Sequence, residues 1–469
     1  MKDADIIVIG AGAAGLSVAS GAAQMGARAV LIEGGEMGGD CLNHGCVPSK
    51  ALIAAAAAAQ GMRDAGRFGV RTVEPEVDFA AVMDHVADVI AGIAPHDSQE
   101  RFEGLGVRVI RGHARFVGRD AVEVNGERLT ARRIVVAAGS RPFVPPVPGL
   151  DGVEYLTNET VFALRERPAH LLILGGGPIG VELAQAFCRL GSQVTLVQRG
   201  TILTREDPEA VEVVREALTR EGVTLREGAE VKAAGEDDGR TWLRIGEERI
   251  AGSHLLVATG REAAVAGLGL EAAGITGDGK GIAVDRRLRT ANRHVFAIGD
   301  IVAEAPRFTH VAGYHAGIVI RQAMLGLPAK ADHSRIPRVT YAAPELAHIG
   351  LTEAEAREAH GAVQVIREDM SGIDRARAER TTEGWIKLVL HRGRPVGVTI
   401  VGAQAGELIA PWVQAMAAGT RLSTLSGLVI PYPTLSDLGK RAAGAYFSMK
   451  LFGNPWVERV VRLIQRVVP

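Results

Sequence analysis

Two cysteines lie five residues apart in a chain that otherwise has few thiols. Cys41 and Cys46 stand in the segment 41–50, and the 469 residues include only three cysteines. In an ideal helix this spacing separates the Cα atoms by about 8–9 Å, whereas a disulfide needs about 4.4–6.8 Å. A bridge would therefore need a distorted turn, which Gly45 permits. Buried structural cysteines, or a metal pair with His44, are the alternatives.

The surroundings of the pair favour reactive thiols. The turn would open the alanine-rich helix expected over residues 51–59, and the positive end of a helix dipole favours a thiolate. The third cysteine, Cys188, stands in the middle of another predicted helix. A cysteine in that position is typically a small core residue.

Two glycine-rich loops recur in the same local context. Each follows a short apolar run and precedes a helical stretch, and their glycines are Gly10, Gly12, Gly15 and Gly175, Gly177, Gly180. In a strand–loop–helix unit, such glycines let the backbone approach a pyrophosphate, which binds the free N–H groups of the helix N-terminus. The duplication predicts two dinucleotide-binding sites.

The residue that follows the next strand differs between the two copies. It is Glu33 in the first and Gln198 in the second, each 23 positions after the first glycine. A glutamate accepts hydrogen bonds from both hydroxyls of an adenosine ribose, whereas its charge would repel a 2′-phosphate. Arg199 and Arg205 follow Gln198 and could bind such a phosphate. The second site is therefore predicted to prefer NADPH, with NADH the less favoured donor.

Composition excludes several classes of protein. The chain has 53 basic and 54 acidic residues, so it lacks the excess of positive charge that nucleic-acid binding needs. Its 47% apolar content suffices for several cores. The N-terminus does not read as a signal peptide, and no window is apolar enough to span a membrane. We expect a cytoplasmic protein.

The domain organisation follows from the duplicated pattern. Residues 135–141 and 256–261 form a second pair of similar segments, in addition to the two loops. We predict an α/β fold with two Rossmann-like dinucleotide-binding domains, the second inserted in the first. The expected ranges are 1–150 with 280–335 for the first domain, 151–279 for the second, and 336–469 for a third. In the third, strands at 338–341, 385–390 and 396–401 suggest a mixed sheet, with a mostly helical stretch over 405–418.

The sequence around the two cysteines resembles that of a known family. Residues 38–50 nearly reproduce the active-site signature of the flavin-dependent pyridine nucleotide-disulfide oxidoreductases, which include lipoamide dehydrogenase, glutathione reductase and mercuric reductase. Residues 112–116, 295–300 and 431–437 match further family motifs, so the resemblance spans the chain. It implies FAD in the first site, NAD(P)H in the second, and a homodimer formed through an α+β C-terminal domain.

The resemblance also implies a role for each matched residue. Electrons would pass from NADPH through FAD to a Cys41–Cys46 disulfide. Cys46 would be the thiolate nearer the flavin, and Cys41 the thiol that meets substrate. Lys50 would pair with Glu182 beside the flavin, and Asp300 would hold the ribitol of FAD. Further cofactor-binding candidates are Ala114, Gly139 and Gly260.

The chain departs from the family near its C-terminus. Tyr432 and Asp437 stand where lipoamide dehydrogenase and glutathione reductase carry a His–Glu pair donated across the dimer. A phenol with an ordinary pKa of about 10 is a poor general base at neutral pH, and mercuric reductase has tyrosine in this position. The C-terminal cysteine pair of that enzyme is missing, however.

Three functional hypotheses follow. The first is reduction of a metal ion or another soft electrophile, as in mercuric reductase. The second is disulfide or dithiol exchange, as in lipoamide dehydrogenase. The third is a redox-sensing flavoprotein that turns over slowly. The tyrosine favours the first over the second.

Two residues beside the cysteines also differ from the family. His44 replaces an apolar residue and could act as a local base or as a ligand for a soft metal, or it could simply pack or face solvent. Asp40 replaces a threonine, and a carboxylate there is expected to raise the pKa of Cys41. No resident metal site is predicted.

The C-terminal tail has the pattern of a basic amphipathic helix. Over residues 455–468, valines and an isoleucine form one stripe, and Arg459, Arg462 and Arg466 lie elsewhere. Two interpretations stay open. The helix packs on the partner subunit or its own domain, or it makes peripheral contact with an anionic membrane surface.

Overall fold

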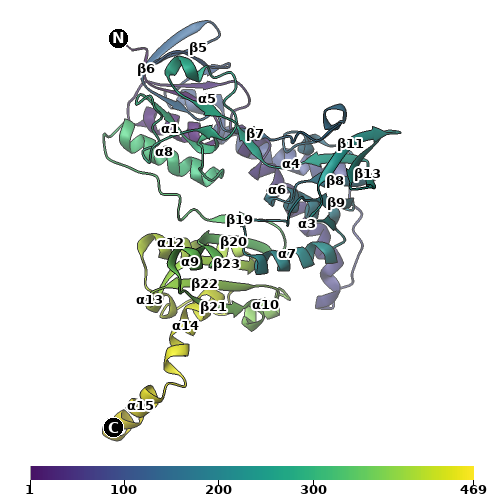
Figure 1. Ribbon diagram of the computed structural model, residues 1–469, viewed down its shortest axis with the longest axis vertical. Coiled ribbons are helices and arrows are strands. Elements are labelled where there is room, and N and C mark those ends of the chain that lie inside the picture. The colour runs from purple at the N-terminus through teal and green to yellow at the C-terminus, as the bar shows by residue number, and fades with distance from the viewer. Residues whose placement is uncertain (1, 469) are drawn as a thin grey trace. The chain divides into compact units, whose positions relative to one another are not determined.

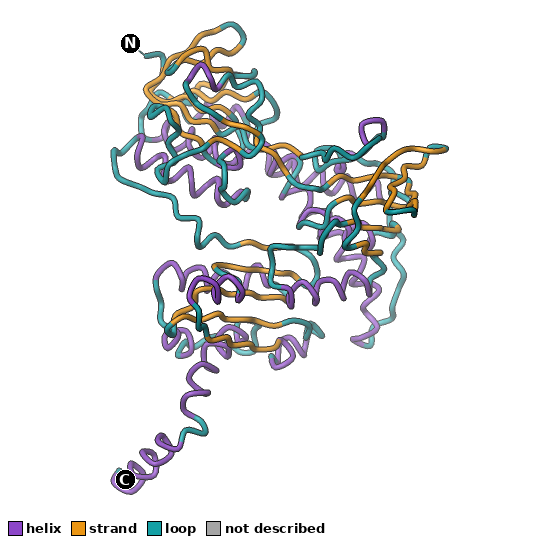
Figure 2. The backbone as a smooth tube through the Cα atoms, viewed as in Figure 1, coloured by secondary structure: helices purple, strands orange, loops and turns teal. Residues whose placement is uncertain are grey.

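The computed structural model describes residues 2–468, apart from the side chain of Met449. The chain divides into two compact units. The first comprises residues 2–66, 70–201 and 223–333, and the second residues 67–69, 202–222 and 334–468. Figures 1 and 2 show the elements of each. The predicted domain boundaries stay a prediction, because these units group the chain differently.

The first unit contains a seven-stranded sheet of order β3-β2-β1-β6-β5-β4, with β18 also paired to β6. The strands are β1 (Ala4–Ile9), β2 (Ala29–Glu33), β3 (Arg108–Arg111), β4 (Arg115–Gly118), β5 (Ala121–Val124), β6 (Glu127–Val136) and β18 (Val295–Ala297). Strands β1, β2, β3, β6 and β18 run parallel. Strands β4 and β5 extend the sheet in the antiparallel sense.

Helices cover this sheet because its central strands are apolar on both faces. Ile6, Ile7 and Val8 of β1 are all fully buried. Helix α1 (Ala13–Gln24) follows β1, and α8 (Thr309–Ala323) lies beside it (Figure 1). Between β2 and β3 come α2 (Gly39–Asn43), α3 (Cys46–Asp64), α4 (Phe79–Ile93) and α5 (Gln99–Gly104).

The first unit also holds the second copy of the strand–loop–helix pattern. A parallel sheet has the order β10-β9-β8-β14. Its elements are β8 (His170–Leu174), α6 (Pro178–Arg189), β9 (Gln193–Val197), β10 (Thr224–Arg226) and β14 (His254–Val257). The duplication expected from the sequence is therefore confirmed at the level of elements.

Smaller antiparallel sheets complete the first unit. One contains β11 (Val231–Asp237), β12 (Arg240–Ile245) and β13 (Glu248–Gly252). The others pair β7 (Ser140–Pro142) with β15 (Arg261–Ala263), and β16 (Gly277–Asp278) with β17 (Gly281–Ile282). The pair β7–β15 joins the two similar segments that the sequence repeats after Gly139 and Gly260.

The second unit is built on a five-stranded sheet of order β19-β20-β23-β22-β21. The strands are β19 (Arg338–Thr340), β20 (Glu345–Gly350), β21 (Gln364–Asp369), β22 (Trp385–His391) and β23 (Arg394–Gly402). Every pairing is antiparallel, so the predicted mixed sheet is wrong. Strand direction depends on how the connections run in space, and residue patterns in single strands do not reveal it.

Helices pack around this second sheet. They are α7 (Pro208–Arg220), α9 (Glu353–His360), α10 (Asp374–Ala378), α11 (Ala405–Leu408), α12 (Ala410–Ala418), α13 (Leu422–Ser426) and α14 (Asp437–Leu451). Helix α15 (Pro455–Val467) follows α14, and none of its described residues is buried. The core includes Leu388, Ile400, Trp412 and Leu438. Among the described residues, no helix is both long enough and apolar enough to cross a bilayer.

Candidate functional site

The two cysteines lie on either side of a break between α2 and α3. Cys41 belongs to α2, and Cys46 is the first residue of α3. Gly45 interrupts the helical path with φ −129° and ψ −112°. A Cβ atom on Gly45 would lie 2.9 Å from the carbonyl oxygen of Asp40, so a side chain there would clash. The distorted turn that the spacing demanded is present, and a glycine is what allows it.

The break brings the two thiols together. They are free cysteines, Cys46 exposed and Cys41 half-buried, and their side chains are hydrogen-bonded to each other. The Cys46 Sγ also lies 3.4 Å from the Thr309 Oγ1, at the start of α8. Because the two thiols contact each other, they can form a disulfide bridge or take part in thiol exchange.

The two thiols are electrostatically unequal. The hydrogen bond from Cys41 lowers the pKa of Cys46 to about 6, and Thr309 and the charge of Lys50 act in the same direction. The same hydrogen bond and its own burial raise the pKa of Cys41. At neutral pH the pair therefore carries one proton, held by Cys41, and one thiolate, on Cys46.

Lys50 and Glu182 form an ion pair between two helices. The Lys50 Nζ lies 2.7 Å from the Glu182 Oε2, and α3 packs against α6. Glu182 is only 6% exposed, so its carboxylate needs this cation. Lys50 follows Cys46 by one helical turn, which places both on the same face of α3. The sequence-based pairing of Lys50 with Glu182 is thus present in the geometry.

A second set of polar contacts fixes the turn behind Cys41. The Arg261 guanidinium lies 3.2 Å from the Asp40 carboxylate. The Asn158 amide donates to the Asp40 Oδ1 at 3.0 Å and to the His44 carbonyl oxygen at 3.1 Å. The backbone of His44 is therefore held, whereas the role of its side chain stays a prediction.

The charge of Asp40 also acts on the other cysteine of the pair. Its charge raises the pKa of Cys46, whereas the dominant causes that raise the pKa of Cys41 are Cys46 and burial. The expectation that Asp40 raises the pKa of Cys41 stays a prediction. Arg261 could have been suspected, because it ends a repeated segment. Asn158 and Thr309 carry no sequence signal, since only the fold brings them to the cysteines.

The first glycine loop has the features of an FAD site. Gly12 caps α1 without a side-chain hydrogen bond, and the first turn contains no acidic residue. A Cβ atom on Gly12 would meet only one atom, at 3.9 Å. The loop is therefore open beside the backbone N–H groups at the start of α1. The Glu33 carboxylate accepts from the N–H groups of Ala11 and Gly35, both at 2.5 Å. Its remaining lone pairs suit ribose hydroxyls. The loop therefore fits the adenosine diphosphate part of FAD.

Asp300 lies in the short turn that follows β18. The Ser140 hydroxyl donates to its Oδ2 at 2.8 Å, and burial raises the pKa of Asp300. The N–H of the preceding Gly299 donates to the Nδ1 of the buried His315 at 3.2 Å. A carboxyl held in this way suits a ribitol hydroxyl. Of the other predicted FAD residues, Ala114 is buried and Gly139 has φ +70°.

The second loop repeats this arrangement with an amide in place of the carboxylate. Gly177 caps α6 without a side-chain bond, and a Cβ atom on Gly177 would meet nothing within 4 Å. The Gln198 Oε1 accepts from the Gly176 N–H at 2.8 Å, as Glu33 does from Ala11. Arg199 is exposed in the same unit, whereas Arg205 is exposed in the second unit. The loop fits a pyrophosphate without adding negative charge beside the ribose.

Comparison with known proteins agrees with this geometry. Residues 4–316 match the family model of pyridine nucleotide-disulphide oxidoreductases, and residues 336–443 match the dimerisation domain of that family. The chain belongs to this family. It is therefore an FAD-dependent oxidoreductase that takes electrons from NAD(P)H, and it carries a dimerisation domain.

Several relatives of this oxidoreductase are similar over nearly their whole length. A mercuric reductase of Streptomyces lividans is 36% identical and covers 95% of this chain and 96% of its own. A dihydrolipoyl dehydrogenase of Thermus scotoductus is 38% identical, with coverages of 95% and 98%. The Cu(II) complex of the HOCl-induced flavoprotein disulfide reductase RclA from Escherichia coli has a TM-score of 0.84 at 28% identity, covering 93% and 98%.

Tyr432 and Asp437 lie in the second unit of the oxidoreductase. The Tyr432 hydroxyl donates to the Asp374 Oδ2 at 2.8 Å, and this bond raises the pKa of Tyr432. Asp437 begins α14 and accepts from Arg441 at 2.6 Å. The two side chains therefore have separate partners and do not form a copy of the family's His–Glu pair within this chain.

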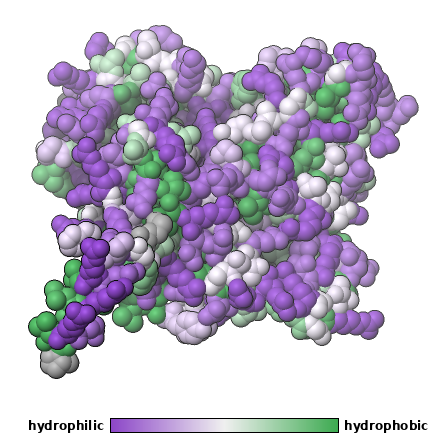
Figure 3. All heavy atoms as spheres, turned by 60° about the horizontal axis from the view of Figure 1, so that its bottom comes forward, coloured by the Kyte–Doolittle hydropathy of each residue, from purple (hydrophilic) through white to green (hydrophobic). Residues whose placement is uncertain are grey.

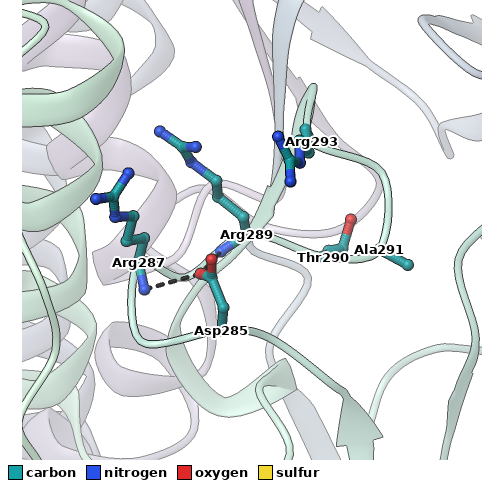
Figure 4. Close-up of a pocket in the computed structure, with 6 residues that line it drawn as sticks. All are labelled: Asp285, Arg287, Arg289, Thr290, Ala291 and Arg293. Atoms are coloured by element: carbon teal, nitrogen blue, oxygen red, sulfur yellow. Dashed lines mark hydrogen bonds between the residues drawn. The ribbon is translucent and has the colours of Figure 1, made fainter.

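A pocket in the first unit lies apart from all these residues. It has a volume of about 260 Å³ and is lined by six residues of the segment before β18, namely Asp285, Arg287, Arg289, Thr290, Ala291 and Arg293 (Figure 4). The Asp285 carboxylate accepts from the N–H groups of Arg287, at 2.8 Å, and Arg289, at 3.0 Å. No residue predicted for the dithiol or the cofactor loops lines this pocket.

Proposed function

We propose that the protein uses NADPH, FAD and the Cys41–Cys46 pair to reduce a metal ion or another soft electrophile. The observation that carries the proposal is the facing pair of thiols with opposite pKa shifts. Bound FAD would supply the hydride-transfer chemistry that links NADPH to the disulfide. Reduction of the S–S bond consumes two electrons and one proton, and leaves a Cys46 thiolate and a Cys41 thiol.

The chain's own residues support the next step. Cys46 is ionised without an external base, because its pKa is about 6. Cys41 loses its proton when both sulfurs bind a soft cation, and thiolates are the ligands that soft metals prefer. When the S–S bond forms again, the two electrons pass to the acceptor. The ion pair of Lys50 with Glu182 lies one helical turn beyond Cys46.

Tyr432 favours this acceptor over a disulfide substrate. Dithiol exchange needs a group that accepts and returns a proton near pH 7. Tyr432 has a raised pKa because its hydroxyl is bonded to Asp374, so it stays protonated. Six relatives at 33–36% identity are named mercuric reductases, which supports the same choice. The Cu(II) complex of RclA supports it further.

The experiment that tests this proposal is a parallel acceptor assay. NADPH oxidation is followed anaerobically with Hg(II), Cu(II), lipoamide, glutathione disulfide and quinones. We expect turnover with a metal ion that is lost in Cys46→Ser and kept in Cys188→Ser, because Cys188 lies on α6 outside the pair. Faster turnover of lipoamide or glutathione disulfide would support the exchange hypothesis instead, and negligible rates with all acceptors would support the redox-sensing one.

The preference for NADPH is part of the same proposal. Gln198 adds no charge beside the ribose, and Arg199, which follows it, is exposed and can bind a 2′-phosphate. In Arg199→Glu we expect the KM for NADPH to rise at least about 10-fold, since a charge-assisted hydrogen bond is lost and a repulsion is added. The KM for NADH should change little. A wild-type KM lower for NADH than for NADPH would refute the preference.

A further inference from the structure

Helix α15 separates its apolar side chains from its polar ones more sharply than any other helix described in the structure. It begins at Pro455 after Asn454, whose side chain accepts from the Trp456 N–H at 3.0 Å. Cap and proline make a well-defined helix start. At 100° per residue, its apolar side chains fall within an arc of about 160° and its polar ones within about 120°. The apolar set is Trp456, Val457, Val460, Val461, Leu463, Ile464 and Val467.

The apolar side of α15 is uncovered. Of the residues described in this helix, none is buried. Trp456 is 73% exposed, Leu463 61% and Val467 74%. In Figure 3, which brings the bottom of Figure 1 forward, the projecting C-terminal part shows green hydrophobic spheres next to purple hydrophilic ones. A helix of this length is marginal in water unless its apolar face is covered, so α15 needs a partner.

The polar side of α15 is basic. It carries Arg459, Arg462 and Arg466 against a single Glu458, in a chain whose formal net charge is −1. The positive charge is therefore local to this helix and is not a property of the whole surface. Glu458 is already paired with Arg462 at 3.2 Å. The surface that complements this face is negatively charged and continuous.

We propose that α15 binds the surface of an anionic phospholipid bilayer, with its axis in the plane of the headgroups. An apolar arc of about 160° suits half-immersion among acyl chains, and the arginines then reach lipid phosphates. A paired helix of a coiled coil presents a narrower apolar seam. The match to the family's dimerisation domain also ends at residue 443, before α15 begins. A lipid surface therefore fits α15 better than a second copy of the chain.

The test uses the FAD-loaded full chain and vesicles of defined composition. One set contains equal parts of phosphatidylglycerol and phosphatidylcholine, and the other phosphatidylcholine alone. We expect cosedimentation with the anionic vesicles only, weakened by added salt. Trp456 emission should shift to the blue on binding, and Trp456→Phe should remove that shift while keeping the cosedimentation.

Charge variants test the recognition itself. Changing Arg459, Arg462 and Arg466 together to Gln should weaken binding to the anionic vesicles about 100-fold, since each arginine near such a surface contributes about fivefold. The matched control changes three exposed arginines of the first unit, Arg119, Arg128 and Arg132, to Gln, and should bind as the wild type does. NADPH oxidation equal to that of the wild type shows that each variant is folded.

Three results would overturn the proposal. They are the absence of binding to anionic vesicles, binding that is unchanged by the triple change in α15, and binding that is unchanged by truncation after Asn454. If truncation instead lowers the molar mass in sedimentation equilibrium without affecting any lipid binding, α15 is an interface between copies of the chain, and the lipid proposal is wrong.

Discussion

At neutral pH Cys41 is a protonated thiol and Cys46 is a thiolate. This difference in protonation determines the chemistry of the pair. The lowered pKa of Cys46 and the raised pKa of Cys41 have the same first cause, the hydrogen bond between them. Cys46, which accepts this hydrogen bond, is therefore the ionised thiol. Neither residue would have this property alone, since an isolated cysteine has a pKa of about 8.5.

A first prediction concerns this thiolate in the reduced enzyme. An absorbance band at the red edge of the flavin spectrum should report the Cys46 thiolate, and it should fade as the pH falls through about 6. Cys46→Ser should abolish the band. Cys41→Ser should keep it but move its midpoint to higher pH, because the hydrogen bond that stabilises the thiolate is weakened. A band that persists in Cys46→Ser would disprove the assignment.

A second prediction concerns the buried His315. Its Nδ1 accepts from the Gly299 N–H, and its Nε2 lies 2.7 Å from the Nε2 of His333. Burial lowers the pKa of His315 to about 4. The neutral form is favoured in the fold, so the stability that it contributes is complete above pH 6.5 and is lost as the pH falls towards 4. The loss amounts to about 3 kcal/mol.

Urea unfolding, followed by release of FAD, measures this effect. The midpoint of the wild type should fall between pH 7 and pH 5, and it should fall less in His315→Gln, whose amide does not titrate in this range. The matched control, His44→Gln, should retain the acid sensitivity of the wild type. Equal acid sensitivity in His315→Gln and the wild type would show that other groups are responsible.

At the scale of elements, the N-terminus of α7 is fixed to β22 by a buried ion cluster. The Lys387 Nζ lies 2.9 Å from the Asp207 Oδ2 and 2.8 Å from the Glu209 Oε1, and Lys387 is only 3% exposed. Burial opposes its charge, but the hydrogen bonds to Glu209 and Asp207 raise the pKa of Lys387. The helix therefore belongs to the second unit, although its sequence lies within the predicted nucleotide domain.

A third prediction follows from this cluster. Lys387→Met should destabilise the second unit by about 3–5 kcal/mol, because Asp207 would stay buried without its cation. Adding Asp207→Asn should restore part of the loss, since the amide remains an acceptor for the start of α7. The urea midpoint of tryptophan fluorescence measures both variants, and Trp385 and Trp412 of this unit are buried reporters. No recovery in the double variant would contradict the account.

At the scale of the whole molecule, we propose that the site takes residues from two copies of the chain. The family's dimerisation domain covers residues 336–443, which include Tyr432. The resemblance implies that Tyr432 serves the dithiol of the partner subunit. Within one chain, Tyr432 is 74% exposed, and its hydroxyl is bonded to Asp374.

A fourth prediction tests this arrangement with mixed dimers. Homodimers of Cys46→Ser should be inactive, and homodimers of Tyr432→Phe should be impaired with the physiological acceptor. Hybrids assembled from the two variants contain one intact site and should regain up to half of the wild-type activity per dimer. Sedimentation equilibrium checks that each sample is dimeric. Hybrids that are no more active than the better parent would show that Tyr432 does not act across the interface.

The sequence by itself determined the features that depend on local spacing. Two glycine loops between strand and helix, the acceptors Glu33 and Gln198, and the Cys41–Cys46 spacing follow from short-range backbone geometry, so a linear pattern reveals them. The resemblance added Lys50–Glu182 as a pair, and the structure contains it at 2.7 Å.

Only the tertiary structure decided the remainder, because it depends on contacts between residues far apart in the chain. Asn158, Arg261 and Thr309 reach the cysteine turn from three other segments. The antiparallel direction of β19–β23 follows from the paths of the connections. The charge of Asp40 raises the pKa of Cys46, and Arg261 and Asn158 contact its carboxylate. The resemblance predicts which thiols react, and the folded surroundings decide which of them is ionised.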